Sequence, residues 1–183
     1  VVATSLNDVV IFHQNASGQL VEVARKAVGP RPLQVRVADV DGDGRPDLLV
    51  ACVGAAQNGL AVLRRDGSGG YLNAVFYDTG DEAPAALVVA DFNADGHLDV
   101  AVANYGAPGW PGSVAVLFQD PANPGVLEVP DLYQGYHGPT SIAAGDLNGD
   151  GRFDLLIADG TTTVRFQDPA LPGRFQPPVR LKP

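Results

Sequence analysis

One acidic loop pattern occurs three times in the sequence, at residues 39–47, 91–99 and 146–154. In each copy, side chains that carry oxygen stand at loop positions 1, 3, 5 and 9, and glycine stands at position 6. Such an array suits a hard cation that takes six or more oxygen ligands, and calcium is the first candidate. We therefore predict about three Ca²⁺ ions. The predicted metal ligands are Asp39, Asp41, Asp43, Arg45, Asp47, Asp91, Asn93, Asp95, His97, Asp99, Asp146, Asn148, Asp150, Arg152 and Asp154, of which Arg45, His97 and Arg152 contribute only their backbone carbonyls.

Position 12 distinguishes this pattern from a helix–loop–helix calcium site. Such a site carries an acidic residue there, whereas this chain has Val50, Val102 and Ile157. Short apolar runs flank each loop on both sides, which is typical of strands. Each loop is therefore predicted to be the turn of a β-hairpin. The alternative for any single copy is an acidic turn without metal, and three copies in register make that alternative less favoured.

The loops begin 52 and 55 residues apart, so they belong to a structural repeat. After the second strand, each repeat has a third apolar run, a turn and a fourth strand. Two of the turns, at residues 119–125 and 167–173, are nearly identical and rich in proline and glycine, which excludes helix. Regular short strands with such turns and a long repeat predict a β-propeller rather than a sandwich.

This organisation resembles the FG-GAP and VCBS repeats of integrin-type β-propellers. The resemblance rests on the motif Asp-x-Asp/Asn-x-Asp-Gly-x-x-Asp between two apolar strands, repeated at blade-like spacing. It implies blades of four antiparallel strands, with the calcium loop joining the first strand to the second. It also implies an extracellular or cell-surface location. Asn93, Ala94 and Asn148 depart from the fullest motif, so the second and third loops are expected to bind calcium more weakly than the first.

The N-terminal repeat is expected to lack its first strand. Residues 1–5, 7–12 and 20–24 match the second, third and fourth strands of the other repeats. We therefore predict an all-β propeller with three complete repeats and one that lacks its first strand. An open strand edge there invites pairing, so self-association through the first blade, or completion by residues outside this chain, is expected. A closed ring of four blades and an arc of a larger ring both remain open. The predicted units are 1–29 (the incomplete blade), 30–81, 82–136 and 137–183.

Composition narrows the classes of partner. The net charge is −9, and ten of the 21 acidic residues lie in the three loops, which argues against nucleic acid. No apolar stretch is long enough to span a membrane. The single cysteine, Cys52, cannot form a disulfide within the chain.

The histidines fall at unrelated positions of different repeats, and no nucleophile or zinc motif is present. We predict no catalytic residues and no enzyme activity.

Aromatic residues in two segments predict a ligand surface. Tyr105 and Trp110 lie in a long loop between a second and a third strand, and Tyr133, Tyr136 and His137 follow in what reads as the next link between blades. Strand parity places both segments on the face opposite the metal loops. Exposed aromatic side chains on loops are common anchors for protein or carbohydrate ligands. The alternative is that these rings pack on each other and order two glycine-rich loops.

These features predict a non-catalytic, extracellular, calcium-stabilised binding or adhesion module. One alternative is a structural subunit that assembles edge-to-edge into an extracellular polymer or fibre. Another is an accessory propeller domain of a secreted carbohydrate-active enzyme.

Overall fold

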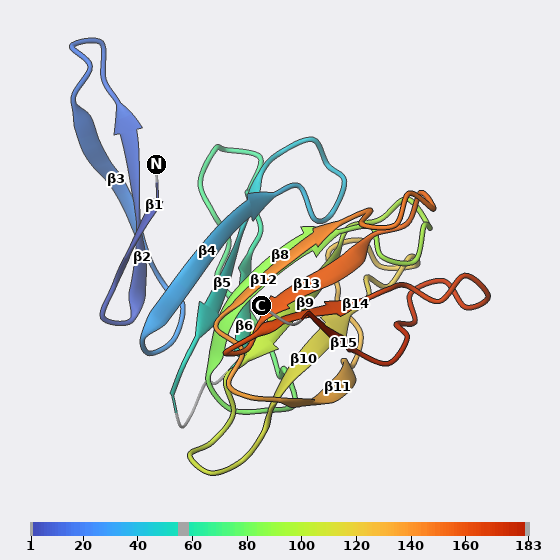
Figure 1. The fold of residues 1–183 in the computed structure, drawn as a ribbon. Helices are drawn as coiled ribbons and strands as arrows, with labels where there is room; N and C mark the ends of the chain where they lie inside the picture. The colour runs from blue at the N-terminus through green and yellow to red at the C-terminus, as the bar shows by residue number, and fades with distance from the viewer. Residues whose placement is uncertain (1, 55–58, 182–183) are drawn as a thin grey trace.

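The computed structural model describes residues 2–54 and 59–181, and every regular element within them is a β-strand (Figure 1). The strands form four antiparallel sheets, which we call the first to fourth blades. No helix within the described residues is long and apolar enough to cross a membrane. The predicted all-β class is therefore confirmed.

Each blade is built from consecutive strands in chain order. The first blade contains β1 (Val2–Ser5), β2 (Asp8–Gln14) and β3 (Leu20–Ala27). The second contains β4 (Pro32–Ala38), β5 (Asp47–Cys52), β6 (Gly59–Leu63) and β7 (Val75–Tyr77). The third contains β8 (Pro84–Ala90), β9 (Asp99–Asn104), β10 (Gly112–Leu117) and β11 (Asp131–Tyr136). The fourth contains β12 (Ser141–Gly145), β13 (Asp154–Ala158), β14 (Thr162–Arg165) and β15 (Val179–Leu181).

The strands of the described residues confirm three four-stranded blades and one blade of three strands. In the first blade, β1 pairs with β2 and is the edge strand of its sheet. It occupies the place of the second strand in the other blades, as the sequence predicted. Val1, which was expected to open this strand, lies outside the described residues.

The blades follow one another in an open arc. Strand β1 lies against β4, β4 and β5 lie against β8, and β8 and β9 lie against β12, so the extensive contacts join consecutive blades. Figure 1 shows the first blade (blue) separated from the fourth blade (orange to red) by the second blade (light blue to teal). The described chain is therefore an arc of a propeller and not a closed ring of four blades.

The hydrophobic core lies between the blades. Val9 and Ile11 of the first blade share one cluster with Leu48 and Val50 of the second. Two similar clusters join the second blade to the third and the third to the fourth. Strands β5, β6, β9 and β10 are buried along their whole length, because their blades are covered on both faces. This double burial explains their continuous apolar sequences, which lack the alternation of a half-exposed strand.

Candidate metal centre

The three acidic loops are the turns of β-hairpins, as predicted. Loop 1 (residues 39–47) joins β4 to β5, loop 2 (residues 91–99) joins β8 to β9, and loop 3 (residues 146–154) joins β12 to β13. Each pair of strands is antiparallel, and the last residue of each loop begins the second strand. The repeated hairpin therefore holds every copy of the loop in the same relation to its blade.

The carboxylate at loop position 1 organises each turn. In loop 1, the two oxygens of Asp39 accept the backbone N–H groups of Asp43 at 3.1 Å and Gly44 at 2.8 Å. Asp91 and Asp146 accept the corresponding N–H groups in loops 2 and 3, at 3.1 and 2.9 Å in each case. The glycine at position 6 has a φ of 82°, 89° and 81° in loops 1 to 3. Glycine adopts this left-handed conformation without strain, which explains why it recurs there.

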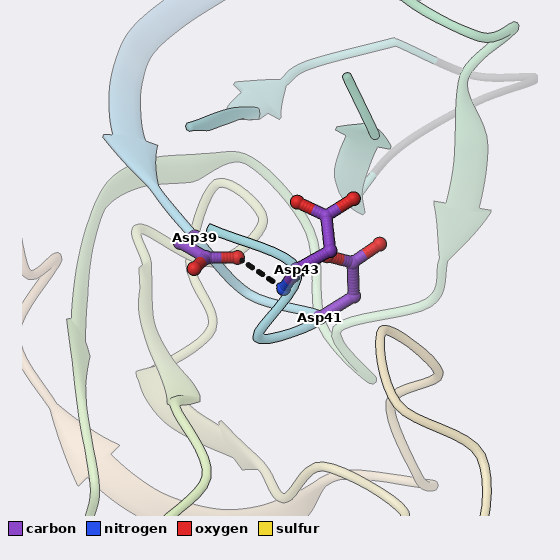
Figure 2. A group of neighbouring side chains, drawn as sticks. All are labelled: Asp39, Asp41 and Asp43. Atoms are coloured by element: carbon purple, nitrogen blue, oxygen red, sulfur yellow. Dashed lines mark hydrogen bonds between the residues drawn. The ribbon is translucent and has the colours of Figure 1, made fainter. Parts of the chain in front are cut away.

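Three carboxylates of loop 1 lie close together. The ligand atoms of Asp39, Asp41 and Asp43 lie within 4.8 Å of one another (Figure 2). Like charges at this separation repel each other, and a cation between them relieves the repulsion. In loops 2 and 3, position 3 is an asparagine, and the side-chain amides of Asn93 and Asn148 donate to the position 5 carboxylates at 2.9 and 3.1 Å.

Arginine side chains partly neutralise these carboxylates. Arg45 pairs with Asp43 and Arg152 pairs with Asp150, so the position 7 side chain contacts the loop in addition to the carbonyl predicted to bind metal. Arg64, at the end of the third strand of the same blade, lies 3.8 Å from Asp41. Arg64 was not predicted from the sequence, because its proximity to loop 1 depends on how the hairpins pack. His97 stands at position 7 of loop 2, where its backbone N–H donates to the carboxylate of Asp95 at 2.8 Å.

The aspartate at position 9 lies apart from the carboxylate cluster of loop 1 and is fully buried in all three loops. In loop 2, Asp99 accepts the N–H of Phe92 at 2.9 Å with one oxygen and the N–H of Gln119 at 2.9 Å with the other. Asp47 and Asp154 make the same pair of bonds in loops 1 and 3. This residue therefore ties the loop to the end of the third strand, a role that is additional to its predicted ligation.

Burial disfavours the ionised form of the aspartate at position 9. It raises the pKa of Asp99 to about 6, and it also raises the pKa of Asp47. Both the bonds from backbone N–H groups and a nearby cation favour the ionised carboxylate. All three loops thus combine oxygen-bearing side chains with a buried aspartate, and loop 1 adds three carboxylates that lie close together. This donor set fits a hard divalent cation such as Ca²⁺.

Four of the five residues predicted to form an aromatic surface surround one cavity. Tyr105, Trp110 and His137 line an open cavity of about 700 Å³, and Tyr136 forms part of its wall. Tyr105 and Trp110 are 51% and 75% exposed. The ring of Tyr105 packs over Gly138, where an added Cβ would stand 2.8 Å from the ring.

The placement of Tyr133 and Tyr136 in a link between blades was wrong, because both residues belong to strand β11. Tyr136 is 1% exposed, and its hydroxyl accepts a hydrogen bond from the Arg165 guanidinium. Tyr133 packs edge-on against Phe175, with 5.6 Å between the ring centroids, and the Arg165 guanidinium lies 4.8 Å from its ring centroid. These two rings therefore pack between the third and fourth blades.

Two glutamines that contact the loops were not predicted from the sequence. The side-chain amide of Gln119 donates to the carbonyls of Val40 in loop 1, at 2.6 Å, and Leu98 in loop 2, at 2.9 Å. Gln167 donates in the same way to Phe92 in loop 2 and Phe153 in loop 3. Each glutamine therefore connects the loops of two consecutive blades. The signal in the sequence is that both nearly identical turns begin with Gln-Asp-Pro.

Comparisons with known proteins bear on this geometry. The family model described as FG-GAP-like repeat matches the chain three times, at residues 1–50, 39–102 and 91–157. No curated protein matches the chain. The loop residues 39–47 and 91–99 lie where consecutive matches overlap, so the family pattern runs from one hairpin turn into the next. The resemblance inferred from the loop motif is confirmed: with matches that reach across residues 1–157, the chain belongs to the FG-GAP-like repeat family.

Proposed function

We propose that this chain is a non-catalytic, calcium-stabilised binding module that works outside the cell. The observation that supports the proposal best is the same oxygen-lined hairpin turn in three consecutive blades, with matching hydrogen bonds in each. Millimolar calcium is an extracellular condition, and extracellular modules bind Ca²⁺ with dissociation constants of about 10⁻⁴ to 10⁻³ M.

The proposed role of calcium is to stabilise the hairpins. A bound ion would neutralise the carboxylates at positions 1 and 5 of each loop and the position 3 carboxylate of loop 1. Asp39 already holds its turn through two backbone N–H groups, so its side chain is oriented before any ion binds. The ends of loops 1 and 2 are further linked by Gln119, so stabilising one loop supports the next blade.

The proposed ligand surface is the cavity lined by Tyr105, Trp110 and His137. Trp110 and Tyr105 are 75% and 51% exposed, so the cavity presents two aromatic rings to solvent. Aromatic faces of this kind suit the apolar faces of sugars and the side chains of a protein ligand. The cavity is therefore the part of the surface that best supports a binding role.

Calcium titration tests the metal part of the proposal. Isothermal calorimetry on the chelator-treated chain is expected to show three Ca²⁺ ions per chain. Asp43→Ala, Asp95→Ala and Asp150→Ala each remove the position 5 carboxylate of one loop, and each is expected to lower the stoichiometry by one. Magnesium serves as the matched control ion, because it requires a smaller octahedral site and keeps its water. The absence of calcium binding at millimolar concentration would refute the proposal.

The single tryptophan tests the ligand part. Trp110 is the only source of indole fluorescence, so a ligand in the cavity is expected to shift or quench the emission of the calcium-loaded chain. Soluble polysaccharides and extracellular matrix proteins form the panel. His137→Ala is expected to weaken any binding that is found, and His13→Ala, an exposed histidine in β2, is the matched control. Binding that leaves the emission unchanged would place the ligand elsewhere.

A further inference from the structure

The contact between consecutive blades has a repeated form, which we call the latch. A glutamine at the end of the third strand bonds to the carbonyl of loop position 2 in the preceding blade. The residue that faces this glutamine across the sheet packs on the side chain of the same position 2 residue. Between the third and fourth blades, Gln167 donates to the Phe92 carbonyl at 2.6 Å, and Phe175 packs on Phe92 with ring centroids 5.9 Å apart.

The same latch joins the second and third blades. Gln119 donates to the Val40 carbonyl at 2.6 Å, and Leu127 shares a hydrophobic cluster with Val40. Leu127 faces Gln119 across the sheet in the way that Phe175 faces Gln167. The position 2 residues are fully covered as a result, with Val40 at 1% and Phe92 at 0% exposure.

The glutamine and the facing apolar residue of a latch are exposed at the N-terminal end of the arc. Gln14 ends the third-strand equivalent β2, and Leu20 faces it across the sheet. The amide of Gln14 donates to the carbonyl of Gly18 in its own turn at 3.0 Å, in an exposed position. Leu20 is 54% exposed, whereas its counterparts Leu127 and Phe175 are 5% and 8% exposed.

The position 2 residue of a latch is exposed at the C-terminal end of the arc. Leu147 occupies position 2 of loop 3, and it is 48% exposed although its counterparts in loops 1 and 2 are buried. Phe153 and Val179, which also belong to the fourth repeat, are 42% and 46% exposed. The fourth blade thus offers a position 2 residue with which a further glutamine and its facing residue can complete a latch.

We propose that the first blade of one copy of this chain docks on the fourth blade of a second copy through this latch. Leu20 would cover the side chain of Leu147, and Gln14 would turn its amide to the Leu147 carbonyl. A second copy is the occupant that fits, because both halves belong to this chain and lie at opposite ends of its arc (Figure 1). This inference goes beyond the proposed binding function and does not depend on the aromatic cavity.

The contact is head-to-tail, so the rotation between the two copies decides which assembly forms. A heterologous contact closes into a ring or grows into an open polymer. Two copies would place eight blades in one ring, which is within the usual range of four to eight blades for a propeller. The inference therefore predicts a ring of two copies as the smallest closed assembly.

Sedimentation velocity in calcium-containing buffer tests the contact between about 1 and 200 μM chain, the range of ordinary transient association. The wild-type chain is expected to form a species with twice the mass of the 19.0 kDa chain. Leu20→Arg and Leu147→Arg are each expected to remove this species, because either change places a charge in an apolar contact. Gln14→Ala is expected to weaken it about three- to tenfold, which corresponds to one hydrogen bond. Val129→Arg is the matched control, because Val129 is 89% exposed and lies outside the latch.

Mixing the two arginine variants gives the decisive result. Each variant keeps one intact half of the latch, so the mixture is expected to form a one-to-one dimer that neither variant forms alone. Superimposable circular dichroism spectra and melting curves establish that both variants fold. A wild-type chain that stays monomeric at every concentration would overturn the inference. So would assembly that survives both arginine changes, or variants that fail to recombine.

Discussion

At the scale of single residues, each loop position has a distinct physical role. Position 1 orders the turn through backbone N–H groups, and position 9 anchors the loop to the third strand. In loop 1, the carboxylates at positions 3 and 5 lie close to the one at position 1. The spacing of oxygen side chains predicted which residues form the loop. It did not predict that both oxygens of the buried position 9 aspartate accept backbone N–H groups, because one of these donors lies just beyond the third strand, which the loop reaches only after folding.

Position 4 provides the first prediction. Ala94 has a φ of 60° in loop 2, where loops 1 and 3 have Gly42 at 71° and Gly149 at 79°. This left-handed conformation costs a residue with a Cβ about 1–2 kcal/mol. We expect Ala94→Gly to raise the free energy of unfolding by about 1 kcal/mol and Gly149→Ala to lower it by about as much, since nothing lies within 4 Å of the added Cβ. Urea unfolding measures both changes, and a Gly149→Ala chain as stable as the wild type would contradict the account.

The arginine beside loop 1 provides the second prediction. Arg64 lies 3.8 Å from Asp41, where it competes with a cation for the same carboxylate. The arginine side chain is 36% exposed, so water screens the pair, and such surface pairs contribute about 0.2–1 kcal/mol. We therefore expect Arg64→Gln to strengthen calcium binding at loop 1 by up to about fivefold.

Calorimetry on Arg64→Gln gives the affinity of each loop. Arg25→Gln is the matched control, because Arg25 pairs with Asp8 and Glu22 in the first blade. Weaker calcium binding in Arg64→Gln than in the control would mean that the arginine supports the loop instead of competing for it.

At the scale of elements, the apolar runs and the repeat predicted the hairpins and the order of strands within each blade. The fourth strands were harder to predict because their sequences are weakly patterned. Strand β11 alternates poorly between buried and exposed residues, and β7 and β15 span only three residues each. Tyr133 and Tyr136 were misplaced for this reason, since their strand follows a long turn and faces solvent along much of its length.

The latch provides the third prediction, at the scale of the contact between blades. Gln119 is 2% exposed, donates to the Val40 and Leu98 carbonyls and accepts the Gly125 N–H at 2.9 Å. Gln119→Met keeps the volume and removes all three bonds. A buried polar group left without its partner costs about 1–3 kcal/mol, so we expect the free energy of unfolding to fall by at least about 2 kcal/mol.

Gln134→Met is the control for this substitution, because Gln134 is exposed on β11. Its effect on urea unfolding is expected to stay within about 0.5 kcal/mol. Equal effects of the two substitutions would show that the latch does not hold the blades together.

At the scale of the whole molecule, stability comes from apolar layers between blades and from the turns that fix each hairpin. The sequence predicted the blades but left the closure of the ring open, because closure depends on the angle between blades and not on any local pattern. The open arc leaves Leu20 and Leu147 exposed at its two ends. The turns carry a concentration of negative charge, with ten of the 21 acidic residues in three loops.

The melting temperature with and without calcium tests the central claim most directly. At about 2 mM Ca²⁺ and a dissociation constant of about 0.1 mM, linkage gives about 1.8 kcal/mol of stabilisation for each occupied loop. We predict that scanning calorimetry will show a melting temperature in 2 mM Ca²⁺ that is higher by at least about 10 °C than in EDTA, with magnesium giving a smaller shift. A melting curve that is the same in calcium and in EDTA would contradict the claim that these loops are calcium sites that hold the propeller together.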